Sequence, residues 1–184
     1  LIPELLNHFL AGGFLSITFI PIFQKHCSQG NRLQAWRSFS NLICIGSAVF
    51  ALLIPLAMIF TPEILGLSGK HITDSSHLSL TVRLTRIIIP AQLFFYWGAF
   101  FSAVQMAEHR FFLPAMAPLC YNLGIIFGGL ILGPSLGIEG FAWGVLIGAF
   151  AGNVVLQLPG TIKSGMRFRP VFRLSDPDLV KYVK

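Results

Sequence analysis

The chain of 184 residues is 54% hydrophobic and only 11% charged, with a mean hydropathy of +0.74. An average soluble domain carries about 25% charged residues, so this composition excludes a soluble globular domain and predicts a polytopic membrane protein. A net charge of +6 would suggest nucleic acid binding in a soluble protein. Here the basic residues lie in short segments between apolar runs, which indicates anchors at the membrane surface and no nucleic-acid partner.

Five apolar runs follow one another along the chain, and we expect each to form a helix that crosses the bilayer. They cover residues 5–23, 39–60, 84–107, 112–132 and 138–160. At about 1.5 Å rise per residue, helices of this length cross a hydrocarbon core of about 30 Å. The sequence therefore predicts an all-α fold, a polytopic membrane helix bundle with about five transmembrane helices.

The first run carries polar residues along one side, at spacings of three and four, among them Glu4, Asn7 and His8. Polar side chains within a span usually face a bundle interior or a water-filled cavity. Asn7 and His8 are therefore candidates for lining a cavity. The alternative is that Glu4 and His8 lie in the membrane interface.

The third run contains Arg86, which has Arg83 on the same face and Pro90 four residues later. One interpretation is an arginine whose side chain snorkels to the outer interface. The other is an arginine that faces a central cavity, where it would attract an anionic head group such as a phosphate.

The fourth run has a row of Pro114, Pro118 and Asn122 at intervals of four residues. Each proline removes a backbone hydrogen bond and can bend the helix, and Asn122 can bond to a freed carbonyl or a facing helix. Bent spans are common where helices line a cavity that opens on alternate sides. A purely architectural kink is the other interpretation.

The fifth run places glycine at every fourth position. Residues four apart share one face of a helix, so these glycines form a smooth strip against which a neighbouring helix can pack closely. The glycine ladder consists of Gly140, Gly144, Gly148 and Gly152.

The distribution of lysine and arginine predicts the orientation of the chain in the membrane. Segments 24–37, 108–111 and 161–174 are predicted to be cytoplasmic, and residue 1 to begin outside. Eight basic residues fall on that side: Lys25, Arg32, Arg37, Arg110, Lys163, Arg167, Arg169 and Arg173. The opposite side receives Lys70 and Arg83.

Both ends of the chain predict a fragment of a longer protein. The chain starts at an expected membrane boundary, and Ser175-Asp176-Pro177-Asp178 has the capping residue, proline and acids of a helix start. Residues 1–174 are therefore expected to form a partial lobe, and residues 175–184 to begin a further, truncated helix.

Motifs for catalysis or metal binding are weak. Gly133-Pro134-Ser135-Leu136-Gly137 matches the G-x-S-x-G pattern, but it lies between two apolar helices and is interpreted as a tight turn. The histidines form no HExxH pair, and the segment 66–70 lacks the spacing of a phosphate loop. The three cysteines share no ligand spacing. We expect no enzyme activity, no metal and no cofactor.

Arg110-Phe111-Phe112-Leu113-Pro114-Ala115-Met116-Ala117-Pro118, followed by Asn122, resembles the R-F-x-x-P-A-x-A-P-x-x-x-N signature of the MurJ (MviN) lipid II flippase family. Segments 140–148 and 157–159 resemble that family's next helix, and segments 2–6 and 13–21 its second helix. The resemblance covers essentially the whole chain. Two positions depart from it: Asn7-His8 replaces an Arg-Arg pair, and Ala11-Gly12-Gly13 replaces Ala-Glu-Gly.

The resemblance implies helices two to six of a transporter of about fourteen helices, in the multidrug/oligosaccharidyl-lipid/polysaccharide exporter superfamily. The first helix and the second lobe would be missing. The implied function is to flip lipid II from the inner to the outer leaflet of the bacterial inner membrane by alternating access, with membrane lipids as further partners. The cavity would use Asn7, His8, Arg86 and Asn122.

Three alternatives stay open at the level of the sequence. The first is an exporter of another lipid-linked polysaccharide or of a drug-like cation. The second is a membrane-embedded enzyme that uses Ser135. The third is a truncated membrane protein without transport activity.

Overall fold

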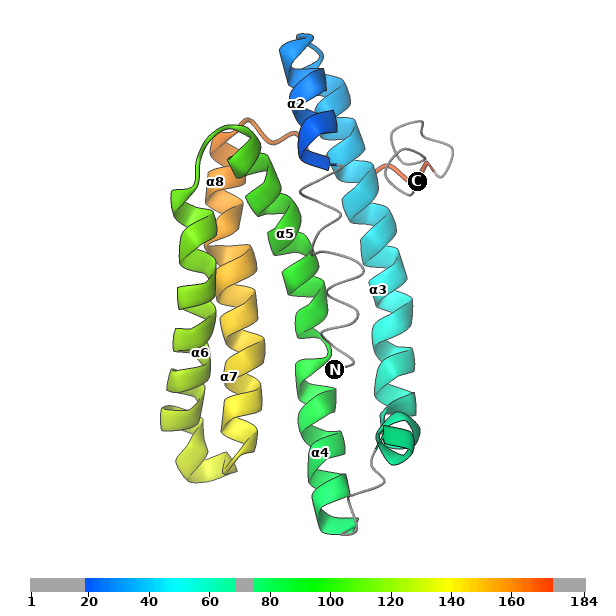
Figure 1. The fold of residues 1–184 in the computed structure, drawn as a ribbon, viewed down its shortest axis with the longest axis vertical. Coiled ribbons are helices and arrows are strands. Elements are labelled where there is room, and N and C mark those ends of the chain that lie inside the picture. Colours follow the sequence, from blue (N-terminus) through cyan, green and yellow to red (C-terminus); the bar gives the residue numbers. More distant parts are fainter. Residues whose placement is uncertain (1–18, 69–74, 174–184) are drawn as a thin grey trace.

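The computed structural model describes residues 19–68 and 75–173, and these residues form an antiparallel bundle of helices (Figure 1). No strand occurs in the described part of the chain. The elements in chain order are α2 (Ile20–Ser28), α3 (Arg32–Ser68), α4 (Ser75–Ile88), α5 (Ala91–Ala107), α6 (Phe112–Leu136), α7 (Glu139–Phe150), the π-helical segment η3 (Ala151–Val155) and α8 (Gln157–Lys163). The predicted all-α class is confirmed.

Four helical stretches among the described residues are long and apolar enough to cross a membrane: Arg32–Gly66, His77–Ala107, Phe112–Leu136 and Glu139–Lys163. The first predicted run, residues 5–23, lies largely outside the described residues, and so does the helix start expected at 175–184. The second helix, α3, is longer than the predicted 39–60 because it begins directly after Asn31, whose side-chain oxygen accepts a hydrogen bond from Gln34 N at 3.3 Å.

The third predicted run is two helices, because the chain breaks between α4 and α5 at Ile89 and Pro90. Proline has no N–H to continue the helical ladder, and Gln92 N instead donates to Ile89 O at 3.1 Å. The two helices remain stacked end to end (Figure 1). The break gives the stretch His77–Ala107 a joint near its middle.

The turn between α6 and α7 is shorter than expected. We predicted a turn across Gly133–Gly137, but α6 continues to Leu136, and the chain reverses at Gly137, whose φ is +60°. Glycine adopts this left-handed conformation without a steric penalty. The hydroxyl of Ser135 donates to Leu132 O at 3.1 Å, so it forms part of the helix end.

Aromatic side chains form the core at one end of the bundle, between α2, α3 and α5. Phe19, Phe39 and Phe100 are 1%, 0% and 0% exposed. Phe19 meets Phe100 edge to face at a centroid distance of 5.2 Å, and Trp36 meets Phe39 at 5.3 Å. Each such pair contributes about 0.5–1.5 kcal/mol beyond the apolar area that it buries, so this end is well fixed.

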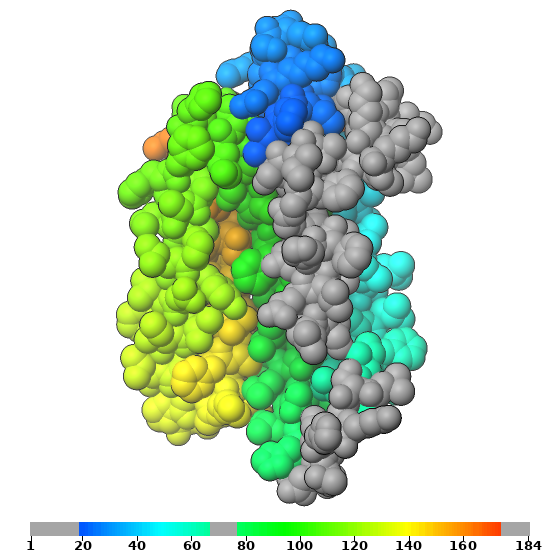
Figure 2. Space-filling model, viewed as in Figure 1, coloured from blue at the N-terminus to red at the C-terminus, as the bar shows by residue number. Residues whose placement is uncertain are grey.

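Helix α6 forms an edge of the molecule (Figure 2). Only 11% of the residues in its most apolar stretch are buried, and its outward side chains are large and apolar. They include Leu119, Leu123, Ile126, Phe127, Leu130 and Ile131, each at least half exposed. Exposure on this scale is stable in lipid, where an apolar side chain meets acyl chains in place of water.

Candidate functional site

The two predicted cavity residues within the described part of the chain lie on different elements. Asn7 and His8 are outside the described residues. Arg86 lies near the end of α4, and Asn122 lies on α6 with an exposed side chain. The described part of the chain therefore contains two of the four candidates, and no hydrogen bond joins them.

Arg86 has a specific partner in the neighbouring helix. Its Nε donates to Met58 O of α3 at 2.9 Å. In an unbroken helix this carbonyl would accept from the N–H four residues later, but that residue is Pro62, which has none. Arg86 thus satisfies the acceptor that Pro62 leaves free, inside a span where an unpaired carbonyl costs several kcal/mol. This contact was not foreseen in the sequence.

Gln92 is a second polar residue near this joint, and the sequence reasoning missed it. It lies in the first turn of α5, is 6% exposed, and its side chain makes no hydrogen bond to another described residue. Most buried side-chain amides are hydrogen-bonded, so the lack of such a bond within the described residues marks this position. Its isolated position in an apolar run, two residues after a proline, was the available signal.

The glycine ladder of α7 and η3 lies directly against α6. A Cβ added to Gly144 would lie 2.6 Å from Gly124 O, and one added to Gly148 would lie 2.6 Å from Tyr121 O. A Cβ on Gly140 would lie 2.7 Å from Gly133 N, and one on Gly152 would lie 2.7 Å from Ala117 O. The two backbones are therefore as close as their atoms allow, and any side chain would separate them.

An apolar groove runs along the same pair of helices. It has a volume of about 400 Å³, and its lining includes Leu123, Phe127, Ile131 and Ile147 beside Gly124 and Gly128. A groove of this composition suits hydrocarbon and offers no group for a sugar or a phosphate. It is therefore a lipid-facing surface and not the polar cavity expected for an anionic cargo.

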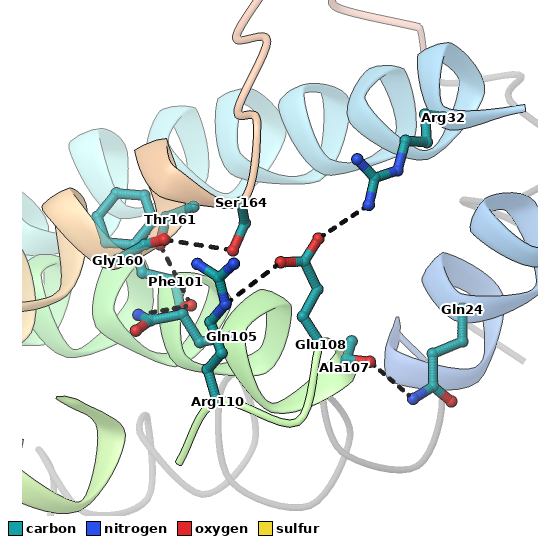
Figure 3. Close-up of polar contacts among 10 residues, drawn as sticks. All are labelled: Gln24, Arg32, Phe101, Gln105, Ala107, Glu108, Arg110, Gly160, Thr161 and Ser164. Atoms are coloured by element: carbon teal, nitrogen blue, oxygen red, sulfur yellow. Dashed lines mark hydrogen bonds and ion pairs between the residues drawn. The ribbon is translucent and has the colours of Figure 1, made fainter. Parts of the chain in front are cut away.

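Ion pairs connect helices at the two ends of the bundle. At one end Arg83 of α4 and Glu139 of α7 are 2.7 Å apart. At the other end Glu108 accepts from Arg32 at 3.3 Å and lies 3.9 Å from Arg110 (Figure 3). From the sequence these arginines were predicted to be membrane anchors, because the order of residues does not indicate which acids lie near them.

A buried polar network ties α5, α6 and α8 together near the second end. Gln105 Nε2 donates to Gln157 Oε1 at 2.8 Å, and Gln157 Nε2 donates to Leu113 O at 2.8 Å. Thr161 Oγ1 lies 3.3 Å from Phe101 O (Figure 3). Gln105, Gln157 and Thr161 are 1%, 0% and 0% exposed. Hydrogen bonds among buried side chains of this kind favour one packing arrangement of the three helices.

After α8 the chain continues as an irregular segment, residues 165–173, which we call the strap. Buried side chains of α3 hold it. Asn41 Nδ2 donates to Arg173 O at 2.9 Å, and Arg173 N donates to Asn41 Oδ1 at 2.9 Å. Arg169 N donates to Ser40 Oγ at 3.1 Å. One amide side chain therefore pairs with both backbone groups of a single residue, as a neighbouring strand would.

Cys27 lies beside the Arg32–Glu108 pair, outside the membrane-spanning stretches. Burial raises the pKa of its thiol above 9.0, and the nearby Glu108 raises it further, while Arg32 opposes both effects. Among the described residues, no group of three or more His, Cys, Asp or Glu side chains could hold a metal ion.

These features define a class: a multi-pass α-helical membrane protein whose spans contain a broken helix and a glycine-packed helix pair. Known proteins narrow the class. The model of the family "Lipid II flippase MurJ" matches residues 1–184. The chain belongs to this family, which confirms the resemblance seen in the sequence.

Individual relatives agree with the family match. The chain is 30% identical to the lipid II flippase MurJ of Burkholderia cenocepacia over 90% of its length and 32% of the relative's. It is 27% identical to a probable lipid II flippase MurJ of Buchnera aphidicola over its whole length and 36% of the relative's. The chain thus spans about a third of the curated relatives that it matches.

A solved structure has the same fold. It is a lipid II flippase MurJ in an inward closed conformation, with a TM-score of 0.76 and 23% identity. The match covers 99% of this chain and 38% of that one. At this level of identity the likeness establishes the helical arrangement alone.

Proposed function

We propose that this chain is part of the N-terminal lobe of a flippase that moves lipid II from the inner to the outer leaflet of the bacterial inner membrane. The observation that carries the proposal is the family match over all 184 residues. Transport would proceed by alternating access, without making or breaking a covalent bond. The protein would not be an enzyme.

The proposed cargo cavity combines this lobe with a first helix and a second lobe supplied by the rest of the transporter. Within the chain we keep Asn7, His8, Arg86 and Asn122 as its candidate residues. The guanidinium of Arg86 uses its Nε for Met58, and its two terminal nitrogens remain for a phosphate, which arginine binds through paired hydrogen bonds. No described carboxylate forms an ion pair with Arg86.

The proposed motion uses the joint at Pro90. Helix α4 is bound to α3 through Arg86 and to α7 through Arg83, but its covalent link to α5 passes through a broken helical turn. Such a half-helix can tilt at a lower energetic cost than a continuous span. Under this proposal α4 changes its tilt when access alternates, and the glycine-packed α6–α7 pair moves as one body.

The test is complementation by the intact protein in a bacterium whose own flippase is depleted, with lipid II in each leaflet measured. The wild type is expected to restore growth and outer-leaflet lipid II. Arg86→Gln keeps a donor for Met58 O but removes the charge, so it is expected to lower flipping with little change in stability. Lys163→Gln is the matched control, since it removes one charge from an exposed side chain outside the proposed cavity and away from α4.

Two results would contradict these proposals separately. Failure of the stably inserted wild type to restore outer-leaflet lipid II rejects lipid II as the cargo. Full activity of the Arg86→Gln variant leaves the flippase proposal standing and removes Arg86 from the cavity.

A further inference from the structure

Three arginines gather where α3 begins and where the chain leaves α8. Arg37 of α3 lines a shallow depression together with Arg167 and Arg169 of the strap, beside Leu33 and Trp36. All three arginines are exposed. None of them forms an ion pair with a carboxylate in the described part of the chain. An anion between them is attracted to each guanidinium, which offsets the repulsion among the three positive charges.

The strap backbone that carries Arg167 and Arg169 is held in place by hydrogen bonds to α3. Arg169 N is bonded to Ser40 and both backbone groups of Arg173 are bonded to Asn41, and the two α3 side chains are 0% and 1% exposed. The strap therefore keeps its position without a ligand. A preorganised group of donors binds with a smaller entropy cost than a flexible basic tail does.

The size of the depression restricts the ligand. It encloses about 10 Å³, which is room for about one water molecule. A metabolite or sugar cannot be enclosed there. A phosphate can lie over the depression, where guanidinium groups from two sides can bind its oxygens in pairs.

Apolar side chains of the strap identify the kind of phosphate. Phe168 and Phe172 alternate with the arginines and are 45% and 68% exposed, and Leu33 is 48% exposed. Aromatic residues beside arginines are typical of the membrane interface, where rings enter the acyl region and guanidinium groups meet the headgroups. A dissolved phosphate or an acidic peptide would leave these rings in water.

We propose that Arg37, Arg167 and Arg169 form a binding site for the headgroup phosphate of an anionic phospholipid, with Phe168 and Phe172 in contact with its apolar part. The site is distinct from the proposed cargo cavity. The proposal does not depend on the chain's transport function, since a lipid of the surrounding bilayer is the ligand.

The experiment counts lipids bound to the intact purified protein by native mass spectrometry, with dioleoyl phosphatidylglycerol and dioleoyl phosphatidylcholine as probes. The triple variant R37Q/R167Q/R169Q is expected to lower the phosphatidylglycerol affinity about 100-fold, because each arginine that loses its direct hydrogen bond to the phosphate costs about fivefold. The control K25Q/R110Q/K163Q removes the same charge from exposed positions at the same end, and a decrease below fivefold is expected.

Several outcomes would overturn the proposal: equal losses in the two triple variants, equal binding of both lipids by the wild type, or equally tight binding of inorganic phosphate or a polyglutamate peptide. If the triple variant does not fold, R167Q and R169Q are measured singly, because both lie on the exposed strap and keep its backbone hydrogen bonds. Each is expected to lower the affinity about fivefold, and unchanged affinity in both rejects the site.

Discussion

At the scale of single residues, two polar side chains complete hydrogen bonds that the helices leave open. Arg86 serves the carbonyl freed by Pro62, and Gln24 Nε2 donates to Ala107 O in the last turn of α5 at 3.1 Å. Tyr96 OH donates to Leu42 O within α3 at 2.8 Å, and Gly46 leaves the space for its ring. In an apolar environment the bonds of Arg86 and Gln24 replace ones that water would supply elsewhere.

The Gln105–Gln157 network predicts a large effect for one substitution. Gln157→Leu removes the hydrogen bond from Gln105 Nε2 to Gln157 Oε1 and the one from Gln157 Nε2 to Leu113 O, so it is expected to lower the free energy of unfolding by about 1–3 kcal/mol. Unfolding of the intact protein in mixed micelles measures this. Gln29→Leu, at an exposed position between α2 and α3, is the control and should change stability little; an equal loss there would contradict the role of the network.

Cys27 gives a prediction that depends on pH. Because the pKa of its thiol is raised above 9.0 by burial first and by Glu108 as well, its alkylation should be half-maximal at a higher pH than that of Ser28→Cys, an exposed neighbour tested with Cys27 replaced by Ala. Arg32→Gln removes the opposing effect and should raise the midpoint further; a lower midpoint would be contradictory. The contribution to stability is present below the unfolded pKa and is lost as pH rises through the folded value.

At the scale of elements, the close approach of α6 and α7 depends on the absence of side chains. The ladder was readable from the sequence because its period matches the helix, but its partner was not, since nothing in the sequence says which helix it faces. The structure supplies the answer through the facing glycines Gly124 and Gly128, whose added Cβ atoms would overlap Gly148 Cα and Gly144 Cα.

Gly144→Ala tests this seam. The new methyl group would lie 2.6 Å from Gly124 O and 3.0 Å from Gly128 Cα, and both contacts are with backbone, so the helices must separate. We expect a loss of about 1–3 kcal/mol in the free energy of unfolding. Gly66→Ala is the matched control, because nothing lies within 4 Å of its Cβ position and alanine favours a helix by about 1 kcal/mol. Equal stability of the two variants would refute close packing.

The broken span α4–α5 shows a limit of reading elements from hydropathy. Residues 84–107 form one apolar run, and a proline in a membrane helix is compatible with either a bend or a break. The choice between a bend and a break depends on the local hydrogen bonding around Pro90 and on the contacts of α4 with Met58 and Glu139. Both partners are distant in the sequence, so single-chain periodicity could not show them.

At the scale of the whole molecule, the turn at residues 29–31, the turn between α5 and α6, and the end of α8 lie together, with the α6–α7 turn at the opposite end (Figure 1). The class, the family and most of the spans could be predicted from composition, run length and local motifs. The tertiary contacts of the candidate site could not, because they join residues far apart in sequence. Asn122, placed in the cavity by its spacing from Pro118, has an exposed side chain.

The orientation in the membrane remains a prediction. With the native cysteines replaced, Gln29→Cys should react with an impermeant thiol reagent only after the cells are permeabilised, and Ser135→Cys should react in intact cells. The reason is the excess of lysine and arginine at the end that contains Gln29. If Gln29→Cys is labelled in intact cells and Ser135→Cys is not, the predicted orientation in the membrane is reversed.

The double hydrogen bond between Asn41 and the backbone of Arg173 has a mechanical consequence. It closes a ring of covalent and non-covalent links from α3 through α5 and α8 and back along the strap to α3. Without these hydrogen bonds the end of α8 could move independently of α3, whereas with them the two helices move together. Any motion that displaces the end of α8 must therefore also displace the first turns of α3, or break the hydrogen bonds between Asn41 and Arg173.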